Sequence, residues 1–83
     1  MTTNEELAAY GLPHVLRPQE VAKVLRVSSK TVSRWVKAGK LRGYKTLGGH
    51  TRFDTQDIID MLVKLGISHE EALKMLTQKV ERR

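Results

Sequence analysis

Apolar side chains recur at helical spacing in two short segments that are separated by Arg26 and Val27. Pro18 is suited to the first turn of the first segment, and the hydroxyl of Ser28 can cap the start of the second. Gly39 ends the second segment, because glycine readily adopts the backbone conformation that terminates a helix. The pattern therefore predicts two short helices joined by a tight turn. Their apolar faces consist of Val21, Ala22 and Leu25 in residues 18–25 and of Val32, Trp35 and Val36 in residues 28–38.

A β-hairpin is predicted after the second helix, because the pattern changes at Leu41. Residues that favour strands, among them Tyr44 and Phe53, flank the pair Gly48-Gly49. Two glycines between such residues are typical of a hairpin turn. We expect strands near residues 42–46 and 51–53.

Helical spacing returns towards both ends of the chain. Asp54 can cap a helix that continues to Gly66, and Ser68 with Glu71 forms a capping box for a last helix. A short helix is expected over residues 3–10. The apolar stripe of the last helix can pack on the rest of the domain or face a partner protein. The two C-terminal stripes consist of Ile58, Ile59, Leu62 and Leu65, and of Ala72, Leu73, Leu76 and Val80.

The positive charge of the chain is concentrated in one segment. The 83 residues carry a net charge of +6, and residues 14–53 hold ten lysines and arginines against a single acidic residue, Glu20. A localised basic region is typical of a protein that contacts a polyanion. The alternative is a generally basic surface, which would spread these charges along the whole chain.

The composition argues against several other classes of protein. The chain has no cysteine, which excludes disulfides, thiolate metal sites and cysteine nucleophiles. His14, His50 and His69 are too scattered to suggest a metal site, and no nucleophile–base pair is evident. No segment has the apolar length of a membrane span or a signal peptide. We therefore expect a cytoplasmic protein that is not an enzyme and needs no cofactor.

Two helices joined by a tight turn form a helix-turn-helix unit, whose second helix lies in the major groove of DNA. Arg34 is the candidate for a bidentate contact to guanine, whereas Lys30 and Lys37 are candidates for phosphate contacts. Trp35 lies on the apolar stripe, so we expect it to pack on the core against Phe53 and not to stack on a base. The alternative is an ordinary amphipathic helix with a solvated basic face. The DNA-binding candidates in this unit are Arg17, Ser29, Lys30, Thr31, Ser33, Arg34 and Lys37.

The hairpin supplies a second candidate surface, which we expect to act as a wing. Basic residues surround its glycine turn, and such a tip can enter the minor groove or follow the phosphates. The alternative is a structural hairpin with solvated charges. The predicted fold is mainly α with a small β-hairpin: an arm or short helix (1–13), a winged helix-turn-helix (14–66) and a C-terminal helix (67–83). The candidate residues of the wing are Lys45, Gly49, His50 and Arg52.

Residues 16–62 resemble the DNA-binding domain of the MerR-like superfamily, and most closely its small excisionase-like and BldC-like members. Three motifs carry the resemblance: residues 16–22 (LRPQEVA), 30–41 (KTVSRWVKAGKL) and 46–53 (TLGGHTRF). Arg17 stands where a capping serine or threonine is common, and Thr51 stands where a second basic residue is common. The resemblance implies a DNA binder without a built-in sensor or a long coiled coil. It also implies binding to repeated sites as a cooperative homo-oligomer.

Three functional hypotheses follow from these observations. The first is a transcriptional regulator that binds double-stranded DNA at repeated sites. The second is an excisionase, or recombination directionality factor, which bends DNA and acts with an integrase through the same surface. The third is a protein-interaction adaptor whose surface is incidentally basic. The first two predict steep salt dependence of duplex binding, and the third does not.

Overall fold

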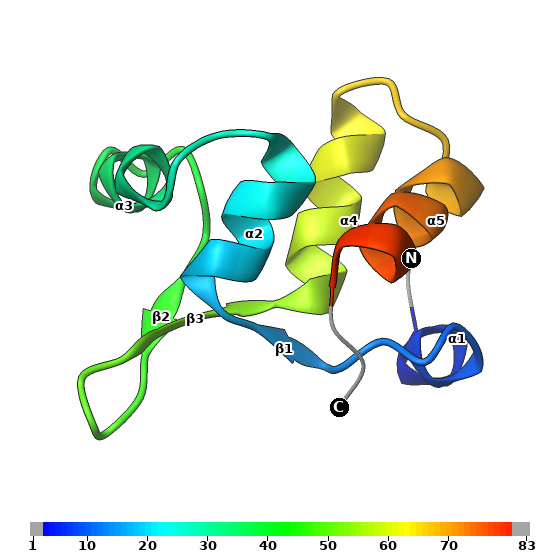
Figure 1. The fold of residues 1–83 in the computed structure, drawn as a ribbon, viewed down its shortest axis with the longest axis horizontal. Helices are drawn as coiled ribbons and strands as arrows, with labels where there is room; N and C mark the ends of the chain where they lie inside the picture. Colours follow the sequence, from blue (N-terminus) through cyan, green and yellow to red (C-terminus); the bar gives the residue numbers. More distant parts are fainter. Residues whose placement is uncertain (1–2, 81–83) are drawn as a thin grey trace.

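The computed structural model describes residues 3–80, which form five helices around a small antiparallel sheet (Figure 1). This architecture confirms the predicted fold class, a mainly helical winged helix-turn-helix with an additional C-terminal helix. None of the helices in this part of the chain is long and apolar enough to cross a membrane. The elements are α1 (Asn4–Ala9), β1 (Val15–Leu16), α2 (Pro18–Leu25), α3 (Ser29–Lys37), β2 (Tyr44–Lys45), β3 (Thr51–Asp54), α4 (Thr55–Lys64) and α5 (His69–Lys79).

Helix α2 begins without a capping serine or threonine, and Glu20 holds its start through the other hydrogen bond of a capping box. The backbone N–H of Arg17 donates a hydrogen bond to Oε1 of Glu20 at 2.9 Å. The Arg17 guanidinium lies 3.3 Å from the same oxygen, and Pro18 occupies the first turn. Half of a capping box therefore holds the helix start, and the departure at Arg17 is compensated locally.

The turn between α2 and α3 is made without glycine. Arg26 itself adopts the left-handed conformation, with φ of 58° and ψ of 44°. The N–H of Val27 donates to the carbonyl of Ala22 at 3.0 Å, which is the wide hydrogen bond expected at a helix end of this kind. The predicted tight turn is therefore present, and its left-handed position is occupied by Arg26, although arginine disfavours positive φ.

The sheet contains one strand more than predicted, and its order is β1-β3-β2. Strand β1 pairs with β3 in the register Leu16↔Phe53, and β2 pairs with β3 in the register Tyr44↔Arg52. The expected strand over 42–46 is shortened to β2. Gly43 directly precedes β2. A Cβ atom at this position would lie only 3.0 Å from the Phe53 ring, so the chain passes directly over the core there.

Thr55 joins the start of α4 to the segment before β1. Its side-chain hydroxyl donates to the carbonyl of Pro13 at 2.6 Å, and its N–H donates to the carbonyl of His14 at 3.0 Å. Asp54 occupies the predicted cap position, but its side chain makes no capping hydrogen bond. The buried Thr55 hydroxyl thus anchors this junction, where the sequence suggested an aspartate cap.

The core lies between the sheet and helices α2, α4 and α5. The stripe of α5 is buried, so its apolar side chains pack on the domain as the first of the two alternatives predicted. Leu65 is the exception among the expected apolar positions: it follows the end of α4 and is 70% exposed. The fully buried large side chains include Phe53, Leu7, Leu16, Ile58, Ile59, Leu62, Leu76, Val21 and Val32.

Helix α1 docks on the same core although it is only six residues long. Leu7 is completely buried, and Leu12 just after the helix is nearly so. Two polar contacts add to this packing: Gln56 donates to Asn4 at 2.8 Å, and His69 contacts Glu6 at 2.8 Å. The described part of residues 1–13 is therefore a docked short helix.

Candidate nucleic-acid interface

The exposed face of α3 gathers most of the candidate residues. Ser29, Lys30, Ser33, Arg34 and Lys37 are all exposed, whereas Val32 on the opposite face is completely buried. Trp35 is half-buried and packs against the core cluster, so the predicted core packing of this side chain is confirmed. The helical phase deduced from the sequence therefore divides apolar from polar side chains correctly.

The start of α3 is fixed by Ser28. Its Oγ accepts a hydrogen bond from the N–H of Thr31 at 3.1 Å and lies 3.0 Å from the Thr31 hydroxyl. Thr31 is half-buried. Among the candidates on α3, Thr31 thus helps to hold the helix end, while its neighbours Ser29 and Lys30 are exposed.

The cations of α3 have no acidic partner within the described part of the chain. Within residues 3–80, no salt bridge joins Lys30, Arg34 or Lys37 to a carboxylate. Arg17 differs, because its guanidinium is paired with Glu20 and its side chain is 37% exposed. The cations of α3 are therefore available to an external anion, whereas the charge of Arg17 is shared with Glu20.

The hairpin forms a projecting element, which we call the wing and define as residues 44–54. Lys45 and His50 are exposed, and Gly49 has a φ of +80°, which glycine adopts without strain. Arg52 is half-buried, and its Nη1 donates to the carbonyl of Thr51 at 2.7 Å. Three of the four predicted wing residues thus face solvent, while the Arg52 head group is held against its own strand.

Helix α3 and the wing lie on the same side of the molecule. Figure 1 shows both at the left of the view, away from α1 and α5 on the right. The turn after α2 leads directly into α3, and the β2–β3 pairing forms the base of the wing. One face of the domain therefore presents a basic helix beside a basic loop.

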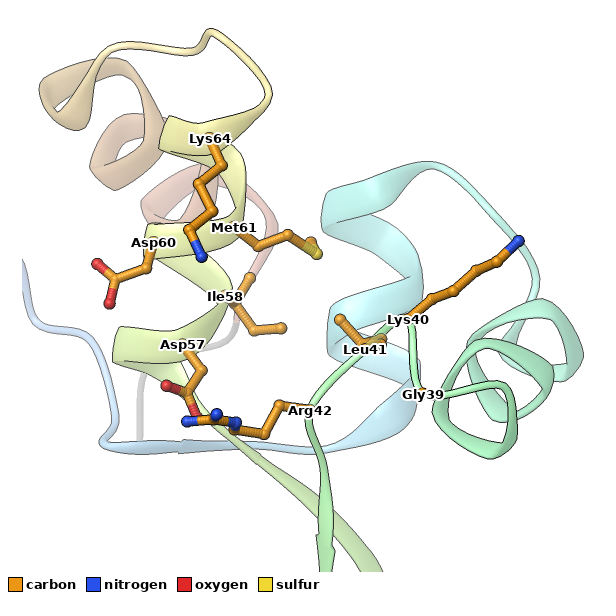
Figure 2. Close-up of a pocket in the computed structure, with 9 residues that line it drawn as sticks. All are labelled: Gly39, Lys40, Leu41, Arg42, Asp57, Ile58, Asp60, Met61 and Lys64. Carbon is orange, nitrogen blue, oxygen red and sulfur yellow. The ribbon is translucent and has the colours of Figure 1, made fainter.

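A groove of about 410 Å³ separates the chain after α3 from α4. Figure 2 shows the Arg42 side chain extending towards Asp57, while Lys40 points away from α4. Asp57 and Asp60 give this groove negative charge beside the positive charge of Arg42 and Lys64. Its mixed charge suits a polyanion less well than α3. No cluster of three or more metal-ligating side chains occurs within the described residues.

Sequence reasoning overlooked two exposed apolar side chains on the wing. Tyr44 is 44% exposed and Leu47 is fully exposed. The signal was present in the sequence, because both residues lie close to a two-glycine turn whose tip has no core to pack against. They belong to the surface that also carries Lys45 and His50.

The comparison with protein families agrees with this geometry. A family model described as a helix-turn-helix domain matches residues 15–64. The match runs from β1 to the end of α4 and so includes α2, α3 and the wing. No curated protein matches the chain. The matched segment is more than half of the 83 residues.

Proposed function

Because the chain belongs to the helix-turn-helix domain family, we propose that it is a sequence-specific double-stranded-DNA-binding protein that regulates transcription. A helix-turn-helix domain is a DNA-binding unit. The observation that carries the proposal is the exposed face of α3, where Lys30, Arg34 and Lys37 have no acidic partner in residues 3–80.

In the proposed complex, α3 lies in the major groove. Arg34 reads guanine through its two parallel donors, and the Ser33 hydroxyl lies on the same exposed face. Lys30 and Lys37 contact phosphates on either side of the groove and set the position of the helix. The wing reaches the adjoining backbone or minor groove through Lys45 and His50.

We further infer that the chain is a small MerR-like protein of the excisionase-like or BldC-like kind. The wing motif over residues 46–53 supports this inference, together with a sheet in which β1 closes against β3. A single module of this size buries only about 600–1,000 Å² on DNA. Cooperative binding of several copies to repeated sites would raise its affinity, and we place its action on DNA in the cytoplasm.

An excisionase function is the second candidate. A helix and a wing on the same side can grip two neighbouring grooves, which is the arrangement that an architectural protein needs to bend DNA (Figure 1). A circular-permutation mobility assay on the selected site measures the bend. A strong bend, together with stimulation of integrase-mediated excision, would assign this function in place of transcriptional regulation.

The salt dependence of duplex binding tests the central proposal. Four to six phosphate contacts should lower the affinity about 10²–10³-fold between ~50 mM and ~200 mM salt. A selection from random duplexes, followed by footprinting, would supply the target site for this measurement. Affinity that is weak and insensitive to salt would contradict DNA binding and favour the adaptor hypothesis.

A further inference from the structure

Leu47 is the most exposed large apolar side chain in residues 3–80, and it lies at the outer end of the wing. Figure 1 shows the loop between β2 and β3 projecting away from every helix. The other exposed apolar side chains, which are Tyr44, Val63 and Leu65, each keep part of their surface against the protein. When a ligand buries an apolar side chain that was wholly exposed to water, the free energy of the system falls and binding is favoured.

The turn holds Leu47 in a defined position. The N–H of Gly49 donates to the carbonyl of Thr46 at 2.9 Å, and the N–H of Thr46 donates to the carbonyl of His50 at 2.9 Å. Leu47 and Gly48 are therefore the two central residues of a closed β-turn, with Gly49 at positive φ behind them.

The tip of this turn is narrow because, of its two central residues, Leu47 has a side chain and Gly48 has none. A Cβ atom at Gly48 would lie 3.2 Å from Cδ2 of His50, so the imidazole occupies the flank of the glycine. Leu47 thus projects alone, with exposed Lys45 and His50 behind it. The end of the wing is therefore a narrow loop with one exposed apolar side chain, close to Lys45 and His50, which can contact phosphates.

We propose that Leu47 enters the minor groove beside the α3 site and makes an apolar contact there that favours A·T base pairs. The minor groove is about 6 Å wide, its edges are phosphates, and only G·C pairs place an amino group on its floor. An apolar side chain buried against that amino group would leave a donor unpaired, which disfavours G·C. This inference rests on the proposed function and adds a residue that confers sequence preference on the wing.

The first measurement compares Leu47→Ala with the wild type on the selected duplex. Because Leu47 is fully exposed, the variant should keep the wild-type thermal unfolding curve. Its affinity should fall about tenfold with an unchanged salt slope, since no phosphate contact is lost. Lys45→Ala should instead lower the salt slope by about one unit. Leu65→Ala, an exposed apolar residue outside the wing, is the matched control and should bind like the wild type.

The second measurement replaces the A·T pairs that footprinting places under the wing. An inosine·cytosine pair has the minor-groove face of A·T and the major-groove face of G·C. The wild type should therefore bind A·T and inosine·cytosine duplexes equally, and G·C duplexes about 3–10-fold more weakly. The variant Leu47→Ala should bind all three with similar affinity.

The outcomes separate this inference from the proposed function. If the wild type shows salt-dependent duplex binding, but Leu47→Ala keeps both its affinity and its preference against G·C, the role of Leu47 is wrong and DNA binding stands. A loss that appears only on tandem sites would also overturn it, because Leu47 would then contact a neighbouring copy. Absence of salt-dependent binding by the wild type would overturn both proposals.

Discussion

The Nε2 atom of His69 lies 2.8 Å from Oε2 of Glu6, which links the first turn of α5 to α1 across 63 positions of sequence. Glu6 directly precedes Leu7, whose side chain is completely buried. The contact therefore adds a polar link to the apolar packing that holds α1 on the domain. Because the carboxyl of Glu6 is ionisable and this contact lowers its pKa, the link makes the docking of α1 sensitive to acid.

Glu6→Gln should weaken the dependence of stability on pH in acid. The hydrogen bond from His69 is the main reason that the pKa of Glu6 lies below its ordinary value of 4.5. A carboxyl with a lowered pKa in the folded state stabilises the fold above its unfolded-state pKa. That stabilisation is lost as the pH falls through the lower, folded-state pKa. Urea unfolding at a series of pH values from ~6 down to ~3 measures the loss, which should be smaller in Glu6→Gln.

The neighbouring residue provides a control for this experiment. Glu5 is exposed, and its carboxylate makes no hydrogen bond in the described part of the chain. Glu5→Gln removes the same charge from the same helix turn and should keep the pH dependence of the wild type. Equal pH dependence in both variants would contradict a specific role for the Glu6–His69 contact.

Arg26→Gly should raise the free energy of unfolding by about 0.5–1 kcal/mol, because glycine adopts the left-handed conformation without a steric penalty. The backbone of Arg26 has φ of 58° in the structure. Lys23→Gly is the comparison, since Lys23 is exposed within α2, and that change should lower stability by about 1 kcal/mol. Chemical denaturation measures the free energy of unfolding of both variants. If both were destabilised to a similar extent, the expected stabilisation by glycine at position 26 would be wrong.

The helices were predictable because their apolar spacing is strong and their ends are marked locally. Residues 18–25 match α2 closely, and the Ser28 cap and Gly39 stop bracket α3. Strand β1 was not predictable, since two residues are too few to show alternation and its pairing partner Phe53 lies far along the chain. Leu65 was misplaced because the helical spacing continues beyond the point where α4 ends.

The candidate site was predictable to a similar extent. The phase of α3 gave the exposed polar face, because Val32 and Trp35 fix the opposite side. The engagement of Arg17 with Glu20 and of Arg52 with its own strand depends on side-chain geometry that no spacing rule contains. A count of basic residues in the sequence therefore overstates how many cations of the candidate interface are available to DNA.

Leu76→Ala should destabilise the fold by about 2–5 kcal/mol, because it leaves a cavity in the core. Leu76 is completely buried on α5. Leu65→Ala makes the same chemical change at a site that is 70% exposed. Leu65→Ala should therefore alter stability by less than about 0.5 kcal/mol. Thermal unfolding of the two variants compares them directly. If Leu76→Ala unfolded like the wild type, α5 would not be part of the core.

Arg34→Ala and Lys37→Ala should affect DNA binding in different ways, although both remove an exposed cation from α3. Loss of a bidentate contact to guanine should cost about 1–3 kcal/mol on the selected site and relax the preference at one base pair. Loss of a phosphate contact should instead weaken binding to all duplexes alike and lower the salt slope by about one unit. Affinities for the selected site and for single-base variants, each at two salt concentrations, distinguish the two effects.

Lys64→Ala is the matched control for both changes. Lys64 is exposed on α4 and lines the groove with Asp57 and Asp60, away from α3 (Figure 2). Its removal subtracts the same charge from the protein but should leave affinity and base preference close to those of the wild type, because general attraction to DNA changes little with one distant charge. If Lys64→Ala weakened binding as much as Lys37→Ala, net charge and not the face of α3 would govern the affinity. If Arg34→Ala kept both affinity and preference, α3 would not be the helix that reads the sequence.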